Sequence, residues 1–312
     1  MKVLKFGGSS LAAPERLKRV IDVVCQSAHH ERTGLVVSAV GGVTNLLVAA
    51  IDAAVRGVTT DDIEHQIQHK HEALMRFPEF QLAGKALEQL LAHHEDLYQQ
   101  LRRDLDGIRL LKTCPNEVRA RVLSTGERLS VQLVYALLSQ RSLHVLLQDP
   151  TLLIPCSGNV LEAQPNLAEL RKRGAELLKQ TFDVALMPGF FAGHKQHAIA
   201  LLGRNGSDYS GALLAYAVQA SACEIWTDVD GVFTADPRLV SSAKVLPSLS
   251  FEEALELCHF GAKVLHPKTI GPLAEIGIPI FIRNTLNPDA PGTRIDRSSV
   301  IPQSSARGLT LL

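Results

Sequence analysis

Several classes of protein are excluded by what this sequence lacks. Its five cysteines contain no C-x-x-C pair, so their spacing indicates neither a zinc site nor a disulfide framework. It has no apolar run of membrane-spanning length, and its N-terminus has none of the basic, apolar and small-residue segments of a signal peptide. We therefore expect a cytoplasmic protein that does not bind membranes.

Net charge is also absent. The 312 residues include 32 Lys and Arg and 32 Asp and Glu, which gives a formal net charge of zero at pH 7. We therefore expect no nucleic-acid partner, and any site for an anion must be built locally. The hydrophobic share of 46% is enough for one large α/β domain or two smaller ones.

Twelve histidines raise the question of a metal site. Several of them fall in polar helical stretches, which favours solvated helix faces over metal ligands. These residues are His65, His69, His71, His93 and His94.

Short β-rich runs alternate with helical patterns, which predicts a largely parallel sheet covered by helices on both faces. We expect strands at 3–6, 34–40, 144–148, 183–187, 198–202, 223–227 and 278–283, with a hairpin turn at 193–197. We expect helices from Pro14 onward and at 43–56, 60–105 with a break near Pro78, 116–140, 207–219, 251–258 and 267–276. Gly126 interrupts one of these helices at a cost of about 1 kcal/mol, which indicates a local packing or binding reason.

The first candidate site follows the first strand, where Lys5 precedes Gly7 and Gly8. Glycines let backbone N–H groups approach an anion closely, and both the next helix and Lys5 add positive charge. The stretch fits neither the G-x-G-x-x-G fingerprint nor the G-x-x-x-x-G-K-[ST] loop, which argues against dinucleotide binding. From these residues alone, an ordinary turn beside a solvated lysine is an equal alternative.

A second glycine-containing turn opens the helix predicted at 207–219. Arg204 can hold a carboxylate through two parallel hydrogen bonds, and Ser207 can add one more. Asp208, taken alone, is better interpreted as a helix cap.

The strand at 223–227 runs into an acidic loop. The loop fails the EF-hand pattern because Trp226 and Pro237 stand at two ligand positions, so we reject calcium. Open α/β sheets bind ligands at the carboxyl ends of their strands, so Thr227, Asp228 and Arg238 can hold a nucleotide. An acidic surface turn is the equal alternative.

The stretch at 260–269 joins two predicted helices. A solvated side chain is the simpler interpretation of Lys263, and a structural role before the proline-started helix is the simpler interpretation of His266.

Seven motifs, taken in order, resemble those of aspartate kinases, which are members of the amino-acid kinase superfamily. They are KFGGSS at 5–10, VSAVGGVTN at 37–45, STGERLS at 124–130, GRNGSDYS at 203–210, EIWTDVDGVFTADPR at 224–238, FGAKVLHPKT at 260–269 and RNTLNPDAPGT at 283–293. GRNGSDYS is most similar to the kinase part of bifunctional aspartokinase–homoserine dehydrogenases.

The resemblance implies a three-layer αβα fold with a mainly parallel central sheet. It implies an amino-acid-binding lobe at 1–195 and a nucleotide-binding lobe at 196–312. It further implies that Lys5, Gly7 and Gly8 contact the phosphates of ATP and that Lys5 and Asp208 form the catalytic pair, with Asp208 organising Lys5. No metal ligands are assigned.

The resemblance also implies two sets of binding residues. Glu127 would pair with the α-ammonium of aspartate and Arg204 with a carboxylate. The aspartate positions are Ser38, Thr44, Glu127, Arg204 and Ser207. The nucleotide positions are Thr227, Asp228, Phe233, Arg238 and Lys263, in addition to Lys5, Gly7 and Gly8.

The activity so implied is ATP-dependent phosphorylation of the β-carboxylate of L-aspartate to 4-phospho-L-aspartate, the first step of lysine, threonine and methionine biosynthesis. A carboxylate with a reference pKa of about 3.9 is ionised at neutral pH and needs no general base. Mg²⁺ bridging the phosphate oxygens and Lys5 would neutralise the charge of the transferring group. A homodimer is expected, and the chain can be part of a longer bifunctional one.

The sequence departs from the family pattern at three points. Phe233 stands where many relatives have tyrosine, and Gly211 replaces the more usual alanine. The pattern normally continues into ACT regulatory domains, which we expect to be absent from this chain. Two alternatives are another kinase of the superfamily, such as glutamate 5-kinase or acetylglutamate kinase, and a catalytically silent or regulatory module of the same fold.

Overall fold

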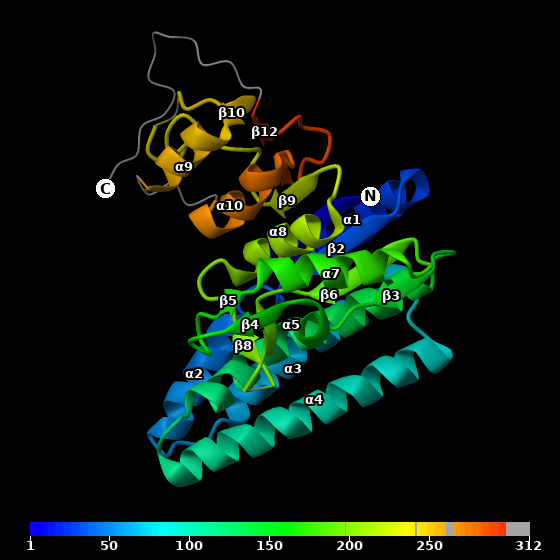
Figure 1. The fold of residues 1–312 in the computed structure, drawn as a ribbon. Helices are drawn as coiled ribbons and strands as arrows, with labels where there is room; N and C mark the ends of the chain where they lie inside the picture. Colours follow the sequence, from blue (N-terminus) through cyan, green and yellow to red (C-terminus); the bar gives the residue numbers. More distant parts are fainter. Residues whose placement is uncertain (197, 241, 260–264, 298–312) are drawn as a thin grey trace.

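The computed structural model describes residues 1–297 except 197, 241 and 260–264 (Figure 1). Its centre is an eight-stranded sheet in the order β10–β12–β11–β9–β1–β2–β6–β3. The strands are β1 Lys2–Phe6, β2 Thr33–Val37, β3 Val145–Leu147, β6 Val184–Pro188, β9 Cys223–Thr227, β10 Ser248–Ser250, β11 Ile280–Asn284 and β12 Thr293–Asp296. All these neighbours pair in parallel except β11 and β12, so the predicted sheet is confirmed.

A second, smaller sheet lies beside the first. Its strands are β5 Gln164–Pro165, β4 Pro155–Ser157, β7 Phe191–His194 and β8 Ala200–Leu201, in that order. Strands β7 and β8 pair antiparallel, which confirms the hairpin expected there.

Helices pack on both faces of the large sheet. They are α1 Pro14–His30, α2 Val43–Val55, α3 Asp61–Met75, α4 Gly84–Leu111, α5 Asn116–Ser139, α6 Pro150–Leu153, α7 Leu167–Leu178, α8 Gly206–Val218, α9 Phe251–His259 and α10 Pro267–Ile276, with short 3-10 turns at Gly8–Leu11 and Pro78–Phe80. Helices α1 and α5 pack on β2, and α8 packs on β1, β2 and β9 between α7 and α10. Since the crossovers β1–α1–β2 and β6–α8–β9 run in opposite directions along the sheet, right-handed connections place α1 and α8 on opposite faces. The three-layer αβα fold is thereby confirmed.

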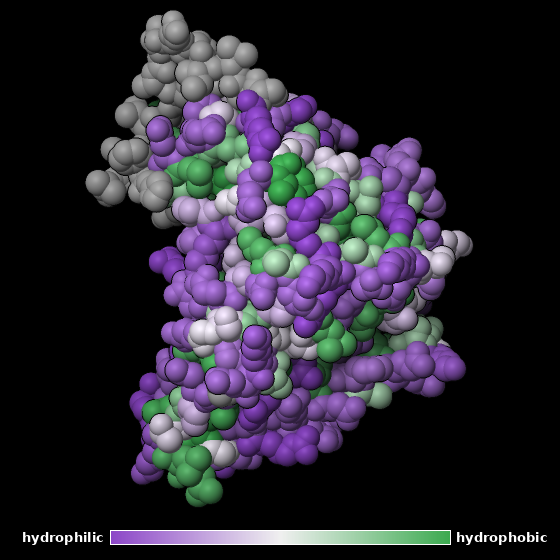
Figure 2. Space-filling model, in the orientation of Figure 1, coloured by the Kyte–Doolittle hydropathy of each residue, from purple (hydrophilic) through white to green (hydrophobic). Residues whose placement is uncertain are grey.

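The long helix α4 lies outside α5, at the bottom of the view in Figure 1. Figure 2 shows that its outward surface is largely hydrophilic, as its polar sequence predicts. Within the described residues, no helix combines the length and apolar character that a bilayer crossing requires.

Gly126 has the packing role expected of it. A Cβ atom at this position of α5 would lie 2.7 Å from Cβ of Ala39, closer than such atoms approach. Glycine therefore lets α5 pack directly against the turn that follows β2. That turn begins at Ser38, so the strand predicted at 34–40 is shorter than expected and ends at Val37.

The histidine prediction is partly wrong. His65, His69 and His93 are exposed, but His71 and His94 are buried between α3, α4 and α5. His71 Nδ1 lies 2.8 Å from the Ile67 carbonyl, and His94 Nε2 lies 3.0 Å from the Leu129 carbonyl. Burial lowers the pKa of His71 to about 4 and that of His94 to about 3, so both imidazoles are neutral at pH 7.

Candidate active site

A cavity of about 390 Å³ opens at the carboxyl ends of the central strands. Four segments line it together with Phe190: the glycine turn after β1, the turn 38–45, α5 at Glu127, and residues 203–207. All five residues predicted to bind aspartate lie in its wall: Ser38, Thr44, Glu127, Arg204 and Ser207. Its volume is within the range of small-molecule sites, which begins at about 300 Å³.

The glycine turn after β1 is shaped by close backbone approach. A Cβ atom on Gly8 would lie 2.8 Å from the Ala39 carbonyl oxygen. Gly8 therefore lets two strand-end turns meet and lines the cavity. Gly7 has a different contact, because its N–H donates to the Trp226 carbonyl of β9 at 3.1 Å.

Lys5 extends from the buried strand β1 to the start of α8. Its Nζ lies 2.5 Å from Oδ1 of Asp208, and the two side chains are only 7% and 15% exposed. Gly211 makes room for this lysine, since a Cβ there would lie 3.0 Å from Cβ of Lys5. The interpretation of Asp208 as a helix cap is wrong. Asn205 holds the cap position of α8, with φ of 54°, and Asp208 lies in the first turn.

Glu127 is the most perturbed ionisable group in the cavity wall. Burial raises the pKa of its carboxyl to about 8, although hydrogen bonds from the backbone of Ala39 and Glu127 and the charge of Lys5 act in the opposite direction. Its Oε2 is buried and has no hydrogen-bond partner among the described residues. A cation placed in this cavity would satisfy that oxygen and ionise the carboxyl.

Opposite walls of the cavity are joined by a hydroxyl pair. Ser38 Oγ donates to Ser207 Oγ at 2.7 Å, which links the end of β2 to the start of α8. Arg204 lies in the same segment as Ser207 and is exposed at the mouth. The cavity thus combines a buried carboxyl group, a guanidinium and the hydroxyls of Ser9, Ser38, Thr44 and Ser207, a set that suits a small zwitterion.

Phe190 is a lining residue that the sequence analysis missed. Its backbone has φ of 74°, which is uncommon for a bulky residue, and its N–H donates to Ser210 Oγ at 2.9 Å. Gly206 packs against it so closely that a Cβ would lie 2.8 Å from Cδ2 of the ring. No local sequence pattern signals this conformation.

The structure describes Thr227, Asp228, Phe233 and Arg238 of the predicted nucleotide residues, but it does not bring them into one cavity with the aspartate residues. Phe6 of β1 pairs with Trp226 of β9, and the two strands are parallel. Thr227 and Asp228 therefore lie beside the glycine turn, at the carboxyl ends of these strands. Phe233 bridges to Val245, and the Arg238 guanidinium is held by Asp236 at 2.7 Å. None of these residues is in the wall of the cavity described above.

The stretch at 260–269 is described only in part, and Lys263 lies outside the described residues. His266 has the structural role expected of it. It caps α10, where its Nδ1 accepts from the Lys268 N–H at 3.2 Å.

Comparisons with known proteins agree with this arrangement. A bifunctional aspartokinase/homoserine dehydrogenase of Buchnera aphidicola is 37% identical over 316 residues, which cover all of this chain and 38% of that protein. The corresponding protein of Haemophilus influenzae is 41% identical over 326 residues, with the same coverage. Among solved structures, E. coli aspartokinase III in complex with aspartate and ADP matches with a TM-score of 0.83 at 30% identity, over 96% of this chain and 65% of that one.

The chain thus spans 38% of the length of these two bifunctional relatives. The family model described as amino acid kinase family matches residues 1–284, which include β1, the glycine turn and every described segment of the cavity. Sequence, fold and site geometry lead to one conclusion: the chain belongs to the amino acid kinase family.

Proposed function

We propose that this chain phosphorylates the β-carboxylate of L-aspartate with ATP, forming 4-phospho-L-aspartate at the start of lysine, threonine and methionine biosynthesis. The observation that carries the proposal is the cavity that combines the buried carboxyl of Glu127, whose Oε2 has no partner among the described residues, with Arg204, next to the buried Lys5–Asp208 pair. The names of the relatives and the aspartate and ADP bound to E. coli aspartokinase III support the same substrates.

Aspartate would be held by charge at both ends. Its ammonium donates to Glu127, which ionises as the ligand binds, and Arg204 forms a bidentate pair with a carboxylate. The hydroxyls of Ser38, Thr44 and Ser207 orient the remaining oxygens. These roles account for the unpartnered Oε2 of the buried Glu127 carboxyl.

Catalysis then depends on charge neutralisation rather than on a base. The attacking carboxylate is already ionised, but it must approach the negatively charged triphosphate. Lys5 is the group that neutralises the transferring phosphoryl. Asp208 is its positioning partner, since the 2.5 Å ion pair holds the ammonium at the end of β1.

The nucleotide would lie at the carboxyl ends of the neighbouring strands β1 and β9. Gly7 and Gly8 flank the phosphates together with Lys5, whereas Thr227, Asp228, Phe233, Arg238 and Lys263 belong to the predicted nucleotide half at 196–312. Phe233 offers packing in place of a hydroxyl contact.

A Mg²⁺ ion that binds together with the phosphates of ATP fits a site of this kind. Among the described residues, no group of three or more His, Cys, Asp or Glu side chains forms a metal site. The ion commonly binds through phosphate oxygens, water and one or two carboxylates, and when bound it would neutralise phosphate charge. Asp208 and Asp228 are the carboxylates that would be available to hold it, and Asp208 is already paired with Lys5.

Cytoplasmic location, a homodimer and a place in a longer bifunctional chain are further parts of this proposal. The last is supported by the two bifunctional relatives, whose kinase-like region this chain matches.

Trapping of the acyl phosphate tests the activity. The purified chain is incubated with ATP, Mg²⁺ and hydroxylamine, and aspartate hydroxamate is measured beside parallel reactions with glutamate and N-acetylglutamate. We expect product with aspartate only. Product with another amino acid would assign a different kinase of the family, and binding of ATP and aspartate without product would indicate a silent module.

A further inference from the structure

Asn205 lines the cavity of the candidate active site but belongs to none of the predicted catalytic or binding sets. It lies in the same wall segment as Arg204 and Ser207, and it is exposed at the mouth. Its side-chain amide forms no hydrogen bond with any residue that the structure describes. The amide is therefore free to contact a ligand in the cavity.

The usual reasons for an asparagine at the start of a helix do not explain Asn205. A capping asparagine has an extended backbone and accepts a hydrogen bond from an N–H of the first turn. Asn205 instead has φ of 54° and ψ of 27°, and its side chain makes no capping bond. Asparagine tolerates this left-handed conformation, but glycine adopts it at lower cost, and the same turn uses glycine for its other left-handed residue, Gly203. The backbone alone thus favours glycine at position 205, so the side chain needs a reason of its own.

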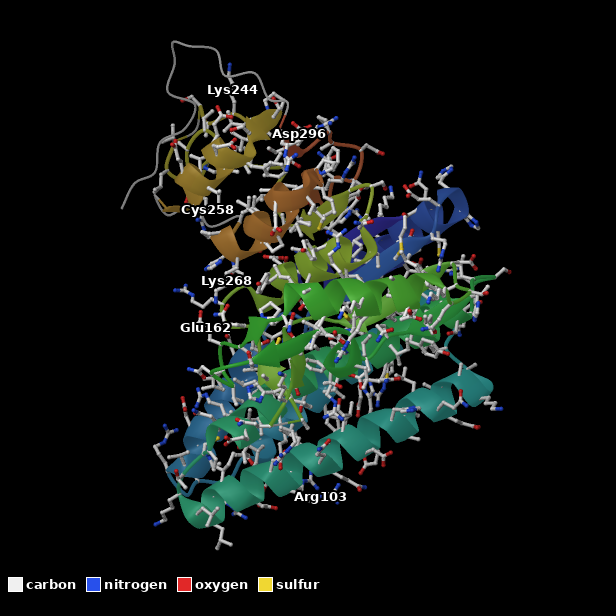
Figure 3. The ribbon with its side chains drawn as sticks, in the orientation of Figure 1. Arg103, Glu162, Lys244, Cys258, Lys268 and Asp296 are labelled. Carbon is white, nitrogen blue, oxygen red and sulfur yellow. The ribbon has the colours of Figure 1, made fainter. Side chains whose placement is uncertain are left out.

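The turn that carries Asn205 is held in place on both sides. The Gly206 N–H donates to the Gly203 carbonyl at 3.1 Å, and the Asn205 carbonyl accepts from the Tyr209 N–H at 3.0 Å. Glu162, which is labelled in Figure 3, packs on the turn, since a Cβ atom on Gly203 would lie 3.1 Å from its Cγ. A ligand that binds the amide of Asn205 therefore has little backbone to order.

The charges around Asn205 favour an anionic group. The guanidinium of Arg204 is its neighbour in the chain, and among the described residues that line the cavity Glu127 is the only acidic one. A carboxylate has about four acceptor positions on its two oxygens, and a bidentate guanidinium fills two of them. An amide N–H beside that guanidinium can fill a third.

We propose that Asn205 is a further aspartate-binding residue, whose Nδ2 donates to the carboxylate that Arg204 binds. The inference deepens the proposed function and rests on it, because it adds a contact to the same substrate site. It makes the mouth of the cavity a two-residue carboxylate site, while Glu127 binds the ammonium of the same ligand. Its test uses binding and needs no turnover.

Replacement of Asn205 by two residues that suit its backbone tests the contact. Asn205→Gly removes the amide and eases the left-handed conformation, and we expect calorimetry to show aspartate binding about three- to tenfold more weakly, with the Kd for ADP and the Tm not impaired. Asn205→Asp keeps the size of the side chain and tolerates the same conformation, but it places a negative charge beside the carboxylate of the ligand. We expect it to weaken aspartate binding more than Asn205→Gly does.

Two controls separate the amide from the backbone. Gln219→Gly is the matched variant, because Gln219 is the exposed left-handed residue at the other end of α8, with φ of 50°. It should leave the Kd for aspartate unchanged. Succinate is the matched ligand, because it has two carboxylates but no ammonium, and Asn205→Gly should weaken its binding by the same factor as that of aspartate.

Three results would overturn the contact. Wild-type affinity for aspartate in Asn205→Gly would leave the asparagine no role in binding. A loss for aspartate without a loss for succinate would assign the amide to the ammonium, and an equal loss for ADP would assign it a general role in the shape of the site. If the wild-type chain and its variants bind aspartate in the expected order but the wild type forms no hydroxamate, the contact stands and the proposed catalysis fails.

Discussion

Binding of aspartate should release a proton from Glu127. In the free protein, burial raises the pKa of this carboxyl to about 8, and Oε2 has no partner among the described residues. An ammonium in the cavity favours the ionised form, so the carboxyl must lose its proton when the ligand binds. With a pKa of about 8, about 0.9 of the molecules are protonated at pH 7, and about 0.25 at pH 8.5.

The same equilibrium weakens aspartate binding at low pH. Deprotonation at pH 7 costs about 1.4 kcal/mol, because the pH lies about one unit below the pKa. The apparent Kd should therefore fall about eightfold between pH 7 and pH 8.5 as the carboxyl becomes ionised in the free protein. Below pH 7 the Kd should rise about tenfold for each further pH unit.

Calorimetry in buffers with different ionisation enthalpies measures the release directly. We expect about 0.9 protons per aspartate at pH 7 and about 0.25 at pH 8.5. Succinate is the matched ligand control, because it has both carboxylates but no ammonium, and it should release none. A release that is independent of pH, or equal for succinate and aspartate, would refute the pairing of Glu127 with the ammonium.

Three further predictions concern single residues. Arg204→Ala should raise the aspartate KM at least about tenfold and change the ATP KM little, as steady-state kinetics will show. Gly126→Ala should lower the free energy of unfolding in urea by about 1–3 kcal/mol, because the new methyl group collides with Ala39. His71 and His94 are neutral when folded but protonate near pH 6.5 when unfolded, so stability should fall by about 2 kcal/mol for each between pH 7.5 and pH 5. His94→Gln should reduce this acid sensitivity and exposed His93→Ala should not, as urea titrations at the two pH values will show.

The periodicity of apolar residues, and residues such as proline that begin or end an element, account for most of the helices and strands that could be predicted. Strand β9 and helix α10 have the predicted bounds, because a β-rich run and a Pro-started apolar stripe mark their limits. Strands β4, β5, β10 and β12 were not predicted. Each has two to four residues, too few to show an alternation, and each is defined by its pairing with another strand rather than by its own pattern.

The burial of His71 could have been predicted from its helical spacing, although the polar composition of α3 pointed to a solvated face. His71 follows Ile67 by four positions and precedes Leu74 by three, which places it on the apolar stripe of α3. The hydrogen bonds of His71 and His94 to main-chain carbonyls make this burial tolerable, and such bonds have no sequence signature. Phe190 is similar, since its left-handed backbone depends on Ser210 and Gly206 across the site.

Individual stretches left the chemistry of the cavity open. The local sequence favoured a helix cap for Asp208, whereas Asn205 is the cap, and only the fold brings Lys5 to within 2.5 Å of Asp208. The resemblance to aspartate kinases favoured a role for Asp208 beside Lys5 over a helix cap, because the resemblance rests on motifs that are distant in the sequence and includes both residues.

In the proposed mechanism, Lys5 acts on the transferring phosphoryl group while Glu127 and Arg204 hold the amino acid. Lys5→Ala tests it most directly when turnover, by coupled ADP release, and aspartate affinity, by calorimetry, are measured on the same preparation. We expect turnover to fall by at least about 100-fold while the Kd for aspartate changes less than about threefold. Turnover close to that of the wild type, or a loss of aspartate binding that matches the loss of turnover in a folded variant, would contradict it.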